Sequence, residues 1–282
     1  MNNSPTREFF QSCWKNTNFM IGFVIILSVI IVAIFAEQIA PFPFDEAHKD
    51  AILQAPNKTY WFGTDDFGRD MFSRIVNGTR ITLKVAFLGA LIQLTLGITV
   101  GLISGYFGGA IDRLLMFIVD VTWCIPGTIL ALAVVTILGK GLTNSIIAIS
   151  LVNWASYART VRAKTMSLKN MAFIETGIAF GEKPFSIMFR YILPNVIPSI
   201  IVLVSMNLPG TIMSTTTLSF LGLGSQPPSP DWGLAISQGM KYISRAQWMS
   251  IFPGLALIYT VFGFNLLGEG LRDLLDPRLK SQ

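Results

Sequence analysis

Residues 173–194 read FIETGIAFGEKPFSIMFRYILP and are the most hydrophilic part of the C-terminal half of the chain. Gly181 and Pro184 interrupt this stretch, and Pro194 closes it. Because glycine and proline are the strongest local interrupters of helices, the pattern predicts a short helix, a sharp turn and a second short helix. Long apolar runs stand on both sides, so we expect this stretch to lie outside a bilayer, between two membrane spans.

The same stretch is not loosely polar. Large apolar side chains recur among its charges, at Met171, Phe173, Ile174, Ile178, Phe180, Phe185, Ile187, Met188 and Phe189. A loop that is only exposed to water does not need so many large apolar side chains, whereas a surface that binds a partner protein does. We therefore interpret the stretch as a docking surface for a partner protein. The alternative is an ordinary cytosolic loop that is charged because it is exposed to water.

The whole composition indicates a membrane protein. The chain has 282 residues, of which 52% are hydrophobic and 13% are charged, about half the ~25% charged residues of a soluble domain. A span needs about 20 apolar residues. Six apolar segments occur, the fourth of them short, at residues 19–39, 81–103, 114–138, 145–157, 196–220 and 251–267. The predicted fold class is an all-α membrane protein with six transmembrane helices.

Basic residues predict the orientation. The loop between the fourth and fifth spans holds six of them against two acids, Glu175 and Glu182; the six are Arg159, Arg162, Lys164, Lys169, Lys183 and Arg190. Cytoplasmic loops carry an excess of lysine and arginine, so this loop is placed in the cytosol. With six spans, both termini then lie in the cytosol as well, where the basic residues Arg7, Lys15, Arg272, Arg278 and Lys280 fit.

These assignments divide the chain into five parts. The predicted parts are a cytosolic N-terminus (1–18), a first transmembrane helix (19–40), an extracytoplasmic loop (41–80), a transmembrane domain of five further spans (81–267, with the cytosolic loop at 158–195) and a cytosolic tail (268–282).

The extracytoplasmic loop contains three acids. Thr64 or Asp65 is the expected N-cap of a helix that leads into the second span. Asp65, Asp66 and Asp70 resemble a cation site, but capping together with pairing to Arg69 and Arg74 explains them more simply, so no metal site is expected.

Asp120 is the one acid well inside a predicted span, and Pro126 follows it by six residues. An ionisable group inside a membrane is functional by default because its burial is expensive. Asp120 and the Pro126 kink are therefore candidates for lining a translocation pathway. The alternative for Asp120 is a structural role, as the partner of a polar neighbour or of a basic group on another subunit.

Motifs for several classes of function are absent from the sequence. One histidine, His48, and two separated cysteines, Cys13 and Cys124, occur, without HExxH, CxxC or GxSxG, which disfavours a membrane-embedded hydrolase. Residues 63–68 have the spacing of a phosphate loop, but Arg69 and Asp70 stand where lysine and serine or threonine are needed. No basic stripe with interleaved aromatics suggests nucleic acid. We expect no catalytic residue and no cofactor in this chain.

The stretch around Gly181 resembles the cytosolic signature of the permeases of bacterial ABC importers, which is Glu-Ala-Ala, three residues, Gly, nine residues, Ile-x-Leu-Pro. Glu175, Gly181, Leu193 and Pro194 match this signature, and the chain departs from it at Thr176, Gly177 and Tyr191.

Further stretches resemble one branch of these proteins, the second (C-type) permease subunit of the oligopeptide/dipeptide/nickel family. They are FGTDDFGRDMFSRIVNGTRITL (62–83), DVTWCIPGTILAL (120–132), WASYARTVRAKTMSLKN (154–170), LSFLGLGSQPPSPDWG (218–233) and FNLLGEGLRDLLDPRLK (264–280). With these five pieces in order and the signature among them, the likeness extends over nearly the whole chain.

The resemblance implies a type I ABC importer permease fold in the bacterial cytoplasmic membrane, with a cytosolic coupling helix between spans four and five. The implied partners are a homologous permease, two cytosolic ATPases that bind ATP and Mg²⁺, and an extracytoplasmic substrate-binding protein. The residues it places at the ATPase contact are Phe173, Glu175, Thr176, Gly177, Gly181, Leu193 and Pro194.

Alternating access is the implied mechanism, and peptides are the first-choice substrate on family frequency. Nickel or a metal chelate is the alternative within the family. An ion-coupled secondary carrier is a further alternative, although it predicts several intramembrane acids and an internal repeat.

Overall fold

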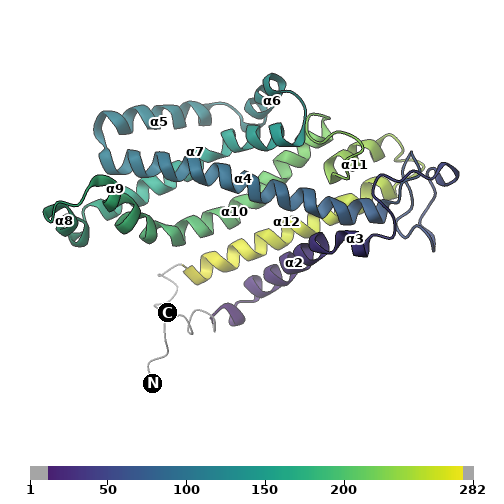
Figure 1. Ribbon diagram of the computed structural model, residues 1–282, viewed down its shortest axis with the longest axis horizontal. Helices are drawn as coiled ribbons and strands as arrows, with labels where there is room; N and C mark the ends of the chain where they lie inside the picture. Colours follow the sequence, from purple (N-terminus) through teal and green to yellow (C-terminus); the bar gives the residue numbers. More distant parts are fainter. Residues whose placement is uncertain (1–11, 276–282) are drawn as a thin grey trace.

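The computed structural model describes residues 12–275, and its regular elements are helices, apart from an isolated bridge between Thr64 and Asp70. The long helices run roughly along one axis of the molecule (Figure 1). Loops gather at one end of this axis, which we call the loop end, and the short helices α8 and α9 lie at the other. The predicted all-α class is confirmed. The predicted positions of Arg7, Arg278 and Lys280 lie outside the described residues.

The N-terminal helix α2 (Thr17–Ile34) packs beside the C-terminal helix α12 (Trp248–Leu275) (Figure 1). The Asn16 side chain caps α2 by accepting a hydrogen bond from the Phe19 amide at 2.8 Å, and α3 (Ala36–Ile39) follows α2 directly. The outward side chains of α2 are apolar, namely Ile21, Phe23, Val24, Leu27, Ile30, Ile31 and Ile34. This face is suited to lipid.

The helix α4 spans Met71–Phe107 and begins ten residues before the predicted second span. Asp70 is its N-cap and accepts from the Ser73 amide at 2.8 Å. The prediction of Thr64 or Asp65 as the cap was wrong, because Gly68, with φ of +76°, turns the chain once more before the helix starts. At 1.5 Å per residue, α4 is about 55 Å long, so it exceeds the ~30 Å hydrocarbon core.

The predicted third span is two helices, α5 (Gly109–Cys124) and α6 (Gly127–Leu138), bent by 96° at the break between them. Pro126 cannot donate a helical hydrogen bond, and a residue before proline is driven to an extended conformation. Ile125 has φ of −93° and ψ of 129°, as this rule requires. The predicted kink is therefore a complete break.

The helix α7 spans Leu142–Lys169 and continues twelve residues past the end of the predicted fourth span. Its charged second half ends the apolar run without ending the helix. It packs along α4 because Gly97, Gly101 and Gly105 form a smooth strip on α4. A Cβ on Gly101 would lie 2.6 Å from the Val161 Cβ, so only glycine permits this approach.

Three elements follow α7 at the end opposite the loops: α8 (Ala172–Ala179), α9 (Pro184–Ser186) and a π-helix (Ile187–Ile192). This order matches the predicted helix, turn and second helix. The chain then enters α10 (Leu193–Phe220), which contains Pro198 and Pro209. A 3-10 turn (Lys49–Ala51) and α11 (Trp232–Met240) belong to the loop end.

Within residues 12–275, four helical stretches are long and apolar enough to cross a membrane: Thr17–Ile34, Met71–Phe107, Pro184–Phe220 and Trp248–Leu275. The bent pair α5–α6 raises the number to as many as five. The predicted fourth span corresponds to α7, which is long enough but carries basic residues through its second half, and it is not among the stretches that meet both criteria.

Candidate functional site

Residues 172–194, the end segment, have one buried side. Ile174, Ile187 and Met188 are each 1% exposed, and they pack with Leu102 of α4 and Val161 of α7 in one apolar cluster. The end segment is therefore packed against α4 and α7 near the ends of these two long helices.

The opposite side of the end segment is apolar but exposed. Phe180 is 85% exposed, and Phe185 and Phe189, stacked with their ring centroids 6.4 Å apart, are 65% and 54% exposed. Phe173 and Ile178 are also exposed. No other described part of the chain covers these five side chains. A contiguous exposed patch of large apolar groups marks a site of protein or membrane interaction.

The turn in the end segment requires Gly181. The Gly181 amide donates to the Ile178 carbonyl at 2.9 Å, and the Glu182 amide donates to the Gly177 carbonyl at 3.1 Å. These two bonds end α8 in a Schellman motif, which places a left-handed residue after the helix. Gly181 is that residue, with φ of +79°.

Most residues predicted at the ATPase contact are exposed. Phe173, Glu175, Thr176 and Gly181 are exposed, whereas Gly177 is buried. The Thr176 hydroxyl donates to the Ala172 carbonyl at 2.7 Å, within its own helix. Four of these residues are therefore accessible to a partner on α8 and its turn, whereas Gly177 is not.

Leu193 and Pro194 lie elsewhere, at the start of α10. Leu193 is half-buried against the apolar cluster under the end segment, and Pro194 is exposed. Proline has no amide hydrogen for a helical bond to residue 190, and the π-helix Ile187–Ile192 stands directly before it. These two residues shape the entry to α10.

A cluster that the sequence did not predict ties α7 to the α4–α5 turn. Arg162 donates from Nε and Nη2 to the two carboxylate oxygens of Asp112 at 2.5 and 2.6 Å, and the Ser104 hydroxyl also hydrogen-bonds this carboxylate. Lys169 Nζ donates to the Tyr106 carbonyl at 2.6 Å. Only the acid–base alternation of α5 and α7 hints at these pairs, and it does not specify which residues meet.

Asp120, the predicted pathway candidate, pairs with Arg159 of the same chain at 2.6 Å, and its side chain is 58% exposed. Its partner is thus on α7, whereas the structural alternative from the sequence named a polar neighbour or another subunit. Pro126, the other pathway candidate, is the N-cap of α6, and no side chain caps that helix start.

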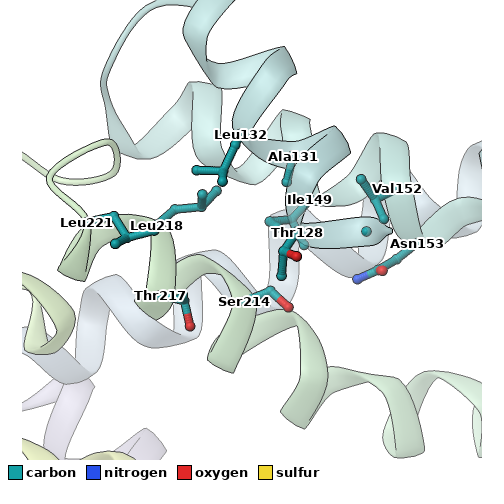
Figure 2. Close-up of a pocket in the computed structure, with 11 residues that line it drawn as sticks. Thr128, Ala131, Leu132, Ile149, Val152, Asn153, Ser214, Thr217, Leu218 and Leu221 are labelled. Carbon is teal, nitrogen blue, oxygen red and sulfur yellow. The ribbon is translucent and has the colours of Figure 1, made fainter. Parts of the chain in front are cut away.

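A cavity of about 300 Å³ opens between α6, α7 and α10, directly after Pro126. Its walls combine apolar side chains with polar groups, as Figure 2 shows. The lining residues are Gly127, Thr128, Ala131, Leu132, Ile149, Val152, Asn153, Ser214, Thr217, Leu218 and Leu221. Concave sites with a few polar groups in an apolar wall suit small-molecule binding.

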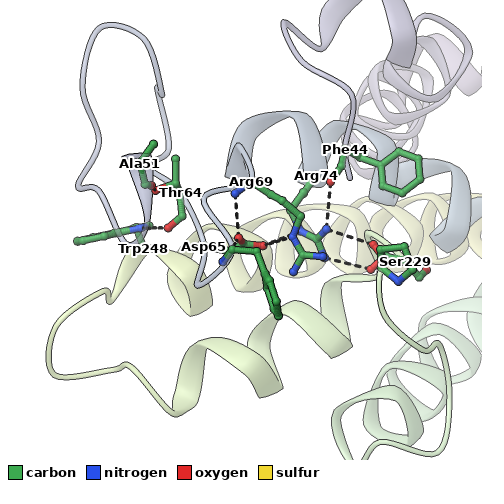
Figure 3. Close-up of polar contacts among 10 residues, drawn as sticks. Phe44, Ala51, Thr64, Asp65, Arg69, Arg74, Ser229 and Trp248 are labelled. Carbon is green, nitrogen blue, oxygen red and sulfur yellow. Dashed lines mark hydrogen bonds and ion pairs between the residues drawn. The ribbon is translucent and has the colours of Figure 1, made fainter. Parts of the chain in front are cut away.

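At the loop end, Asp65 is the centre of a buried polar network (Figure 3). Its Oδ2 lies 2.7 Å from Arg69 Nε and 3.6 Å from Arg74 Nε. The predicted pairing of this acid with both arginines is confirmed, and Asp70 acts as a cap. Asp66 is partly buried, and burial raises the pKa of its carboxyl group.

The Arg74 guanidinium, 2% exposed, holds two distant loops together. It donates to the carbonyls of Phe44 at 3.1 Å, Pro228 at 3.2 Å and Ser229 at 3.1 Å (Figure 3). The Trp248 indole closes the network by donating to the Thr64 carbonyl at 3.0 Å. Within residues 12–275, no cluster of three or more His, Cys, Asp or Glu side chains could hold a metal ion.

Comparison with protein families gives two matches. The family described as "binding-protein-dependent transport system inner membrane component" matches residues 97–281. The "N-terminal TM domain of oligopeptide transport permease C" matches residues 4–56.

Curated relatives match along almost their whole length. The dipeptide transport system permease protein DppC of Alkalihalophilus pseudofirmus is 44% identical over 99% of this chain and 91% of its own. The glutathione transport system permease protein GsiD of Pectobacterium atrosepticum is 39% identical, over 99% and 93%. The DppC protein of Haemophilus influenzae is 38% identical, over 99% and 96%.

Solved structures share the fold. A chain of the inward-facing MetNI methionine ABC transporter aligns with a TM-score of 0.57 at 21% identity, over 72% of this chain and 97% of that one. A chain of an amino acid ABC transporter crystallised with histidines gives a TM-score of 0.52 at 17% identity, over 75% and 95%. With the family match over residues 97–281, these likenesses confirm the resemblance, and this chain belongs to the binding-protein-dependent permeases of ABC importers, as a C-type subunit of the oligopeptide/dipeptide/nickel family.

Proposed function

We propose that this chain is the permease subunit of an importer of di- or oligopeptides and forms half of the translocation pathway. Its partners would be a homologous second permease, two cytosolic ATPases and an extracytoplasmic substrate-binding protein, all in or at the bacterial cytoplasmic membrane. The names of the relatives support the substrate, because dipeptides and glutathione are both peptides.

The observation that carries the proposal is the uncovered aromatic face of the end segment, formed by Phe173, Ile178, Phe180, Phe185 and Phe189. A water-exposed surface of this kind needs a partner. The chain has no phosphate loop of its own, since Arg69 and Asp70 are committed to a buried pair and to a helix cap. An ATPase is the partner that supplies what the chain lacks.

In this proposal, Phe173, Glu175, Thr176 and Gly181 enter a groove on an ATPase, while Gly177, Leu193 and Pro194 shape the segment that presents them. ATP and Mg²⁺ are held by the ATPases and no cofactor by this chain. Closure of the ATPase pair moves the end segment, and with it α7 and α10, so that the pathway alternates between outward and inward access.

The proposed topology has six spans, in which the bent pair α5–α6 is the third and α7 the fourth, with both termini in the cytosol. The first residues of α2 lie beside the last turns of α12, since a Cβ on Gly270 would come within 2.6 Å of the Phe19 Cα. An even number of crossings agrees with this proximity. The basic residues of α7 and the end segment favour the cytosol for that end.

The test is the substrate dependence of ATP hydrolysis by the purified complex in liposomes, with binding protein loaded in turn with a dipeptide or with a nickel chelate. We expect co-purification with two ATPase chains and stimulation of hydrolysis by the dipeptide-loaded protein. Stimulation by the nickel-chelate-loaded protein alone would contradict the assignment of peptides as the substrate. Uptake driven by an ion gradient without ATP would contradict the assignment of an ATP-driven importer.

A further inference from the structure

Among residues 12–275, two ion pairs join α5 to α7, and they differ in how completely their charges are satisfied. Asp112 and Arg162 make two hydrogen bonds with each other, and Ser104 adds a third. Their side chains are 17% and 30% exposed. Bidentate geometry with an additional donor is the form that a structural ion pair takes.

The second pair is less complete. Arg159 donates from Nη2 to Asp120 Oδ1 at 2.6 Å, and within residues 12–275 this is the one hydrogen bond that either side chain makes. The two side chains are 39% and 58% exposed. The Arg159 guanidinium also lies 4.1 Å from the centre of the exposed Trp123 ring. One carboxylate oxygen and several guanidinium hydrogens therefore remain free for another molecule.

The hydrogen-bonding groups that this pair leaves unused need water or a polar ligand. A charged group exposed to hydrocarbon is costly, so ionisable residues in membrane domains face a bundle interior or a wet cavity. By this rule we expect the exposed side of Asp120 and Arg159 to face water or a polar ligand, although other exposed side chains of α5, such as Phe117 and Val121, are apolar.

The pair also lies next to the cavity between α6, α7 and α10 along the chain. Val152 lines that cavity, and Arg159 follows it by seven residues, which places both on the same side of α7, about 10 Å apart along the helix. Trp123 stands just before the break at Pro126, and Gly127, after the break, lines the cavity. Arg159, with Asp120 paired to it and Trp123 beside it, therefore lies between the cavity and the end segment along α7.

We propose that Asp120, Trp123 and Arg159 form a contact site for a zwitterionic solute, a peptide with a free α-ammonium and a free α-carboxylate. The proposal rests on the proposed function and assigns this group its place in the pathway. The ammonium group of the peptide takes the free oxygen of Asp120, and its carboxylate takes the free guanidinium hydrogens of Arg159.

An exchange of partners explains why a pair, rather than a single charge, suits this position. Without solute, Asp120 and Arg159 neutralise each other; with solute, each charge keeps an opposite charge beside it. Neither state leaves an isolated charge, which is the expensive condition inside a protein. The Trp123 ring holds the guanidinium plane in place through cation–π contact, so the site stays formed between solutes.

The test replaces both charges at once, Asp120→Leu with Arg159→Met, in the complete complex in proteoliposomes. Apolar replacement of an ion pair that is only structural is often neutral for stability. We expect an unchanged thermal unfolding midpoint and at least about a tenfold loss of labelled dipeptide uptake at saturating loaded binding protein, the loss expected for a charged hydrogen bond. The control is Glu37→Gln, which removes the carboxylate of an exposed ion pair while Arg80 keeps its hydrogen bonds to the Ala33 and Ile34 carbonyls, and we expect it to keep wild-type uptake.

Uptake at the wild-type rate by the Asp120→Leu, Arg159→Met variant would overturn the contact site while leaving the peptide importer in place. Absence of dipeptide uptake by the wild-type complex would instead overturn the proposed function. If the double variant does not assemble, Arg159→Lys serves, because it keeps the charge and the pairing with Asp120. A several-fold rise in the half-saturating dipeptide concentration supports the site, and an unchanged value contradicts it.

Discussion

Gly181 shows what a single residue contributes to the end segment. No atom within 4 Å would obstruct a Cβ at this position, so the glycine is required by its φ of +79° and not by lack of space. Gly101 is the opposite case, a glycine in ordinary helical conformation whose missing side chain lets α7 approach α4. The sequence marks both residues as glycine but does not distinguish these two reasons, since the second depends on a helix far along the chain.

Gly181→Asp tests the coupling role of the turn. Aspartate tolerates the left-handed region better than most residues, so it disturbs the turn less than other substitutions would while it adds a carboxylate beside the exposed apolar side chains. We expect the permease to insert normally and the peptide transported per ATP hydrolysed to fall about tenfold. Glu175→Arg should do the same. The control is Gly254→Ala, a helical glycine with open space around it. Normal uptake in both variants would contradict an ATPase contact here.

Asp231 carries a pH dependence at the loop end. It caps α11 by accepting from the Leu234 amide at 2.9 Å, and burial raises the pKa of its carboxyl group. Because the folded protein then binds this proton more tightly than the unfolded chain, stability is greatest below the ordinary carboxyl pKa of about 4 and falls as pH rises through the raised value. Asp231→Asn keeps the cap but does not titrate. We expect the thermal unfolding midpoint of the complex to depend less on pH between pH ~4 and neutrality in this variant. An unchanged dependence of the unfolding midpoint on pH would mean that other titratable groups determine it.

At the scale of elements, the helices α4 and α7 form the rod that carries the end segment. Gly97, Gly101 and Gly105 give close packing along it, and the Asp112–Arg162 pair fastens its far end to α5. The sequence predicted the apolar part of both helices, but the span predicted for α7 ended too early. Charged residues end the apolar run there, whereas the helical hydrogen bonding continues. The break at Pro126 was foreseen as a kink, and its 96° size depends on packing that the sequence does not display.

Gly101→Val tests whether this close packing is needed. The added methyl groups would overlap the Val161 side chain and the Ala158 carbonyl, and overpacking of this kind costs about 1–3 kcal/mol. We expect a lower thermal midpoint of the purified complex and reduced uptake. Gly210→Ala, with open space around its Cβ, is the control and should match the wild type. If the Gly101→Val protein were as stable as the Gly210→Ala protein, α4 and α7 could move apart without a loss of stability, which would contradict the need for close packing.

Arg74→Met tests the network of the loop end. The substitution leaves Asp65 short of a partner and removes the donor to three loop carbonyls, which costs about 3–5 kcal/mol for a buried ion pair. The control Glu37→Gln removes only the carboxylate of an exposed pair with Arg80 and should cost less than about 1 kcal/mol. Limited proteolysis of the loops should be faster in the first variant alone. Equal protection of both would place the stability of these loops elsewhere.

At the scale of the whole molecule, long helices connect the loop end to the end segment (Figure 1). Arg74 joins the loops at the first end, and phenylalanine rings are exposed at the second. The family and the position of the end segment followed from local motifs, because glycines, prolines and a run of charges are visible in the sequence. The Asp120–Arg159 and Asp112–Arg162 pairs join residues 39 and 50 positions apart, and Arg74 reaches residues more than 150 positions away. Such partners are set by helix packing, which hydropathy does not specify.

The most direct measurement of the central claim, that the end segment connects this pathway to an ATPase, is ATP-driven uptake of a labelled dipeptide by proteoliposomes carrying Phe180→Asp with Phe185→Asp. Both rings are exposed and their replacement leaves the buried side of the segment intact. The predicted result is a permease that inserts normally, no longer retains its ATPases on purification and loses uptake. Retention of the ATPases with undiminished uptake would contradict the claim.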